Sequence, residues 1–129
     1  MKKLKCLLLF LILSFSIGTE VYAQVSKQDA IDLVFDSIIM NRVDSVNVYM
    51  EPAIQNCEYY VMSPYDSIQS PYNSFWLFFI DENPEYDWGH NCEHVLIDSY
   101  SRSHWSVKRR LPPLRYLSFR GIISSSKVE

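Results

Sequence analysis

The sequence lacks an apolar run long enough to cross a membrane. Its longest apolar stretch, Cys6–Phe15, is shorter than the roughly 20 residues that a spanning helix needs. It follows the basic segment Met1–Lys5 and precedes Val21–Ala23, which offers small side chains to a signal peptidase. This order is typical of a cleavable secretory signal peptide over residues 1–23. Because Gln24 follows the predicted cut, we expect a secreted or periplasmic protein with no lipid anchor and no stable membrane anchor.

Positive charge is also scarce, with 12 Lys+Arg against 15 Asp+Glu. Removal of residues 1–23 takes away three lysines and one glutamate, which leaves nine basic and fourteen acidic residues and a formal charge of −5. This sign argues against nucleic acid and anionic membrane surfaces as partners. The remaining chain is large enough for one domain with one core, and its abundant apolar and aromatic residues argue against disorder.

No internal repeat or low-complexity run is visible, and the apolar pattern predicts one helix followed by strands. Ser26 can cap a helix whose apolar residues recur at helical spacing as far as about Met40. Alternating or continuous apolar runs then predict strands at 46–50, 57–62, 74–80, 93–100 and 105–109, with loops at 63–73 and 81–91 and a hairpin turn at 101–104.

One helix before consecutive strands predicts an α+β fold, in which the N-terminal helix packs on a four- to five-stranded antiparallel sheet. The domain should span residues 24–113, because Pro112-Pro113 ends the regular pattern, and a basic C-terminal tail should follow over residues 114–129. The strand at 74–80 is apolar on both faces. Since one helix covers one face, the other face needs the long loops, the tail or a partner.

Cysteine is scarce as well, and only Cys57 and Cys92 remain after signal cleavage. In an oxidising compartment two remaining cysteines favour a disulfide. The bridge would close a loop of about 35 residues and stabilise the fold by about 3–4 kcal/mol in the chain-entropy model. The alternative is that Cys92 is a buried free thiol.

The densest group of chemically versatile residues is His90, Cys92 and His94, each two positions apart. On an extended strand all three point to one side, and imidazole and thiolate are good ligands for zinc or copper. Same-face neighbours on a strand lie about 6.6 Å apart, however, which is long for a shared metal without a bend. We treat a metal site as an alternative and predict no cofactor.

Three further chemical roles are weaker than their structural alternatives. A Cys–His nucleophile at Cys92 has no Gly-rich turn or helix N-terminus nearby to form an oxyanion hole, so we predict no enzyme. The acidic loop lacks EF-hand spacing and should be solvated rather than calcium-binding; its residues are Asp81, Glu82, Glu85 and Asp87. The tryptophans could line a groove but should serve packing; they are Trp76, Trp88 and Trp105.

Two parts of the chain resemble known modules. The stretches 76–81 and 88–98 and the later Pro112-Pro113 resemble uncharacterised secreted domains of Bacteroidota and other bacteria, in which a Trp-x-His-Pro-Cys-x-Tyr motif runs into a strand. Here Asn91 replaces the proline and His94 replaces the tyrosine. The opening helix is similar to the first helix of PepSY-type and propeptide-type modules of secreted peptidases. The motif residues are Trp76, Trp88, His90 and Cys92.

The first functional hypothesis is a secreted, non-catalytic binding module. The resemblance implies a prodomain-like or inhibitor-like partnership with an exported peptidase, made through an exposed sheet edge or the tail. One alternative is a small periplasmic metal- or ligand-binding protein that uses His90, Cys92 and His94. The other is an orphaned structural domain of a larger exported protein.

Overall fold

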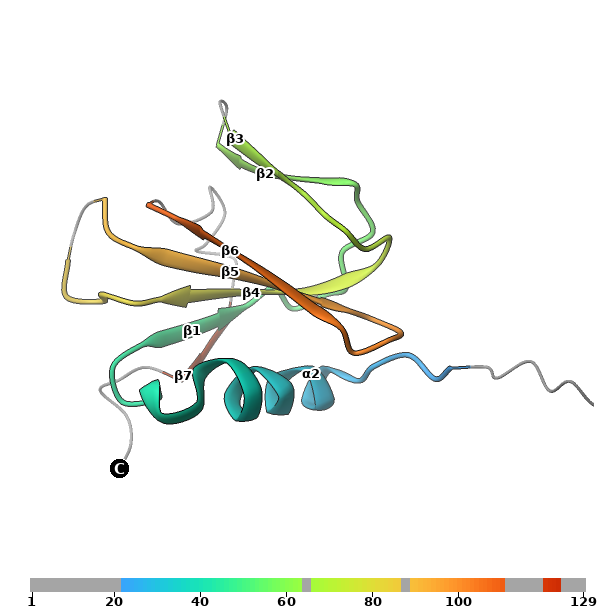
Figure 1. The fold of residues 1–129 in the computed structure, drawn as a ribbon, viewed down its shortest axis with the longest axis horizontal. Coiled ribbons are helices and arrows are strands. Elements are labelled where there is room, and N and C mark those ends of the chain that lie inside the picture. The colour runs from blue at the N-terminus through green and yellow to red at the C-terminus, as the bar shows by residue number, and fades with distance from the viewer. Residues whose placement is uncertain (1–21, 64–65, 87–88, 111–119, 124–129) are drawn as a thin grey trace, which may run out of the picture.

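The computed structural model describes residues 22–63, 66–86, 89–110 and 120–123. These residues form one helical segment, a five-stranded sheet in the order β6-β5-β4-β1-β7 and a two-stranded sheet, β2-β3 (Figure 1). All neighbouring strands are antiparallel. The predicted α+β class, with one helix on a four- to five-stranded antiparallel sheet, is confirmed.

The helical segment begins where the sequence predicted but changes its winding partway along. The Oγ atom of Ser26 accepts a hydrogen bond from Asp29 N at 3.1 Å and caps α2 (Lys27–Leu33). The segment continues as a π-helical stretch, η1 (Val34–Ile39), and a short 3₁₀ turn, η2 (Met40–Arg42). One face is buried, as the helical spacing predicted; Ala30, Val34 and Ile39 are at most 1% exposed.

Four predicted strands of the main sheet are present. They are β1 (Asn47–Met50), β4 (Phe75–Asp81), β5 (Cys92–Asp98) and β6 (His104–Arg109). The predicted hairpin between β5 and β6 is confirmed, because Asp98 N donates to Ser103 O at 2.8 Å across the turn. The predicted second strand corresponds to β2 (Tyr59–Ser63).

Two strands lie where no strand was predicted. Part of the predicted loop 63–73 is β3 (Asp66–Gln69), which pairs with β2 as a hairpin. The prediction that regular structure ends at Pro112-Pro113 is wrong, because β7 (Arg120–Ile123) pairs with β1 at an edge of the main sheet. The other residues of the predicted tail, 114–119 and 124–129, and the two prolines lie outside the described residues.

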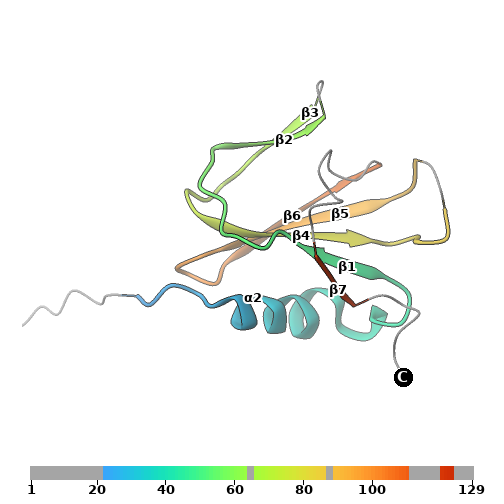
Figure 2. The same ribbon diagram turned by 180° about the vertical axis from the view of Figure 1, so that it is seen from behind.

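Each face of the main sheet is covered by a different layer (Figures 1 and 2). The helical segment covers one face and packs Val34 and Ile39 against Val48, Phe78 and other core residues. On the opposite face, Phe75, Leu77, Phe79, Cys92 and Leu96 form a second cluster beneath the β2-β3 side of the molecule, with Tyr60 of β2 packed against it. The second face that the sequence left open is thus partly covered by Tyr60 of the hairpin and by Cys57 and Tyr72 of the segments that connect the hairpin to the main sheet.

The chain enters the fold immediately after the predicted cleavage site. Val25 is 4% exposed, and its N–H donates to Ser99 O at 2.6 Å. The indole N–H of Trp76 donates to Val25 O at 2.9 Å. Residues 1–21 of the predicted signal peptide lie outside the described residues. Within the described ranges, no helix is both long and apolar enough to cross a membrane.

Candidate functional site

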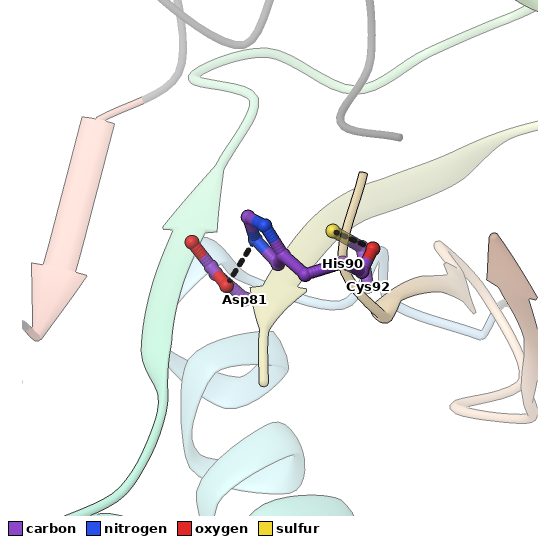
Figure 3. Close-up of side chains that lie close together, drawn as sticks. All are labelled: Asp81, His90 and Cys92. Carbon is purple, nitrogen blue, oxygen red and sulfur yellow. Dashed lines mark hydrogen bonds and ion pairs between the residues drawn. The ribbon is translucent and has the colours of Figure 1, made fainter. Parts of the chain in front are cut away.

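The strongest grouping of chemically versatile side chains lies where β4 and β5 are joined. Asp81 is the last residue of β4 and Cys92 the first of β5, and the antiparallel register places them directly opposite each other. Gly89 has a φ of +49°, a backbone conformation that glycine adopts at no steric cost. It lies just before His90, whose side chain lies beside Asp81 and Cys92 (Figure 3).

The three side chains are close enough to share one ion. Their possible ligand atoms, one from each residue, all lie within 4.8 Å of one another. His90 Nε2 is 2.8 Å from Asp81 Oδ1, and the Cys92 thiol donates to the carbonyl oxygen of His90 at 3.5 Å. The side chains of Asp81 and His90 are each 14% exposed, whereas Cys92 is fully buried.

The contact between His90 and Asp81 has the length of an ion pair but not the geometry of a hydrogen bond. Both ring nitrogens of His90 are buried, and neither makes a hydrogen bond within the described residues. Nε2 therefore has the Asp81 carboxylate as its ion-pair partner, whereas Nδ1 has no hydrogen-bond partner among the described residues.

The local electrostatics keep the Cys92 thiol protonated. Burial, followed by the negative charges of Asp81 and Glu82, raises the pKa of Cys92 to about 12. A nucleophilic cysteine needs a thiolate near neutral pH. The environment of Cys92 therefore disfavours a nucleophilic thiolate.

The structure brings together two of the three predicted ligands and replaces the third. His90 and Cys92 lie in the cluster, but Asp81 joins them in place of His94. His94 is fully buried in β5, and its ring packs on Phe79 with centroids 5.3 Å apart. It lies two residues further along the strand, where the rise carries it away from the end of the sheet.

The predicted disulfide is not formed. Cys57 and Cys92 are both free thiols, although Cys57 packs against the core cluster that contains Cys92. The Cys92 sulfur instead contacts the His90 carbonyl. Burial also raises the pKa of Cys57. The structure thus agrees with the alternative of a buried free thiol at Cys92.

The three carboxylates of the acidic loop that the structure describes do not converge on one point. Asp81 faces His90, whereas Glu82 contacts Arg42 at 3.2 Å and Lys108 at 3.0 Å. Glu85 is exposed, and Asp87 lies outside the described residues. Because Glu82 is held by two cations on the helix side of the sheet, this loop does not present the carboxylate cage that calcium prefers.

Of the three tryptophans, two are described and both serve packing, as expected. Trp76 is 7% exposed in the core beneath the helix, and Trp105 packs against the cluster on the opposite face. They therefore line opposite faces of the sheet rather than one groove. Trp88 lies outside the described residues.

Sequence reasoning missed Asp81 as a partner of His90 and Cys92. No local signal identified it, because the sequence placed Asp81 in the loop 81–91, and it meets Cys92 only through the register of β4 and β5. No family model matches this chain, and no curated protein or solved structure is detectably similar to it. The functional argument therefore depends on the geometry.

Proposed function

We propose that this chain is an exported, non-catalytic protein-binding module that contacts a protein partner along strand β6. The observation that carries the proposal is the arrangement of the main sheet. Within the described residues, β6 pairs only with β5, so its outer backbone N–H and C=O groups have no partner strand. An unpaired edge is a template for the addition of a strand from another protein.

The side chains of β6 suit an added strand. His104, Ser106 and Lys108 are exposed and alternate with half-buried residues, among them Trp105 and Val107. A partner strand would extend the apolar surface beside Trp105 and Val107 on the hairpin side of the sheet. In strand addition the side chains that alternate along the edge provide specificity, while the backbone hydrogen bonds provide affinity.

The charged end of β6 is already neutralised within the molecule. Lys108 Nζ lies 3.0 Å from Glu82 Oε1, and Arg109 Nε lies 3.2 Å from Asp66 Oδ2. A partner strand therefore needs no matching acidic residues there. The likeness of the first helix to propeptide-type modules favours a secreted peptidase as the partner.

Two observations support the exported, non-catalytic part of the proposal. Val25 enters the core two residues after Ala23, which is exposed, so cleavage after Ala23 leaves every core residue of the described chain in place. The raised pKa of Cys92 disfavours the thiolate that a cysteine hydrolase would need.

The test compares a lysine placed on β6 with a lysine placed on another strand. Natural edge strands use lysine to prevent added pairing, so Ser106→Lys should weaken partner binding by at least about tenfold, or 1.4 kcal/mol. Ser67→Lys, at an exposed serine of β3, is the matched control. The partner is captured from the native secreted fraction with the wild-type chain, and its dissociation constant is then measured with each purified variant.

We expect the wild-type chain and Ser67→Lys to inhibit a recovered peptidase. We expect Ser106→Lys to lose this inhibition. Equal binding by both variants would refute the β6 contact. Recovery of a partner that is not a peptidase would refute the peptidase assignment while keeping the binding module.

A further inference from the structure

We propose that Asp81, His90 and Cys92 form a zinc-binding site at the β4–β5 end of the sheet. The site is independent of partner binding on β6 and revises the ligand set that sequence spacing suggested. Carboxylate, imidazole and thiolate are the three ligand types that zinc takes in proteins. The three residues come from a strand end, a loop and a strand start that the hairpin register brings together.

The spacing of the ligand atoms is close to that of a tetrahedral site. Metal–ligand distances of 2.0–2.3 Å place neighbouring ligand atoms about 3.3–3.8 Å apart. In this chain His90 Nε2 and Asp81 Oδ1 are 2.8 Å apart, and no pair of the three ligand atoms is more than 4.8 Å apart. Shifts of about 1 Å in side chains at a strand end reach the required geometry.

The His90 ring lies where a shared ion would bind. Its Nε2 is 2.8 Å from Asp81 Oδ1, and neither of its two buried nitrogens makes a hydrogen bond within the described residues. A cation between Nε2 and Oδ1 would take both atoms as ligands.

Charge balance favours a divalent cation at this point. With Asp81 ionised, Cys92 as thiolate and His90 neutral, the three ligands carry two negative charges and the zinc complex is neutral. When the Zn–S bond forms, the Cys92 S–H bond breaks and its proton passes to solvent, and the metal loses a bound water for each ligand gained. Neutrality matters because Cys92 is fully buried, and an isolated charge there would be strongly destabilised.

Three protein ligands leave a fourth position that is open to solvent or to an external group. A polar cavity of about 250 Å³ opens beside His90 and would give access to that position. Its lining consists of Asn83, Tyr86, Gly89, His90, Asn91 and Arg110. A bound zinc ion would also tie the β4–β5 connection to the end of the sheet, so the metal should stabilise the folded chain.

The experiment measures zinc stoichiometry by native mass spectrometry and cobalt binding by absorption, using the chain that begins at Gln24. The expected result is one zinc ion per wild-type chain and a thiolate-to-cobalt charge-transfer band. His90→Gln and Asp81→Asn should each weaken zinc binding by at least about 100-fold. Cys92→Ser should abolish the charge-transfer band.

The matched controls change the same residue types outside the cluster. His104→Gln alters an exposed histidine of β6, and Cys57→Ser alters the other thiol of the described chain; both should bind zinc as the wild type does. Cys92→Ser also removes a core thiol and destabilises the fold. The zinc affinity of the more peripheral variant His90→Gln is therefore the deciding measurement. Absence of zinc from the wild-type chain, or unchanged affinity in His90→Gln, would overturn the proposal.

Discussion

The burial of Val25 allows a quantitative test of where the mature chain begins. Cleavage after Ala23 would make Val25 the second residue, and its side chain is 4% exposed. Its backbone makes two hydrogen bonds, to Ser99 O and from Trp76 Nε1. Removal of residues 24 and 25 should lower the free energy of unfolding by about 4 kcal/mol. About 2 kcal/mol comes from the buried side chain, and about 1 kcal/mol comes from each hydrogen bond.

The assay is urea unfolding, followed by tryptophan fluorescence, of two chains that begin at Gln24 and at Ser26. Val25→Ala in the longer chain keeps both backbone hydrogen bonds and should lose only about 2 kcal/mol. Equal midpoints for the two chains would refute the reasoning. Sequencing of the exported protein from its N-terminus should begin at Gln24, and a start beyond Val25 would contradict the predicted boundary.

Three other perturbations test the packing of the sheet and the state of its thiol. Trp76→Phe leaves the buried Val25 carbonyl without its indole donor and should lower the free energy of unfolding by about 1–3 kcal/mol. Trp105→Phe, on the half-buried β6, should lower it by less in the same urea assay. Equal losses in the two variants would contradict this prediction. Burial raises the pKa of Cys92 from its ordinary value of 9.0 to about 12, so its contribution to stability is full below pH 9 and is lost as the pH rises toward 12. Relative to Cys92→Ala, the free energy of unfolding should fall by about 1.4 kcal/mol per pH unit over this window, and a pH-independent difference would sink the argument. Arg42→Met removes the guanidinium 3.6 Å from the Glu93 carboxylate and should cost about 1–2 kcal/mol, because the arginine is partly exposed. Adding Glu93→Gln should recover part of that loss, whereas strictly additive losses would show that the pair is uncoupled.

The sequence predicted the elements whose burial pattern is regular. β4 reads as a continuous apolar run from Phe75 to Ile80, and β5 contains the apolar stretch Val95–Ile97, because both strands contribute side chains to the core clusters on the two faces of the sheet. The two strands that were missed carry little of this signal. In β3 only Ile68 is buried, and β7 contains Gly121, a residue that weakens strands. Its partner, β1, lies about 70 residues earlier in the chain, so no local pattern reveals the pairing.

Prediction of the candidate site failed at His94 for a related reason. Alternation correctly places His94 and Cys92 on one face of β5, since both lie on the side away from the helix. The alternation along β5 gives no information about β4, the strand that pairs with it. Asp81 joins the cluster through this pairing, because it lies opposite Cys92. Ligands contributed across strands follow from register, and register follows from the core packing of the whole hairpin.

The two carboxylates at the end of β4 act on opposite faces of the sheet, and this division positions the cluster. Glu82 is held on the helix side by Arg42 and Lys108, and Arg42 also reaches Glu93, which lies one residue after Cys92. These contacts join the end of β4 to the start of β5 and to the end of β6 from the helix side. With that end fixed, Asp81 and Cys92 stay opposite each other on the other face, and His90 has only to fold back from Gly89 to meet them. An ion-pair network without ligand atoms in the cluster thus maintains the register that the proposed zinc site requires.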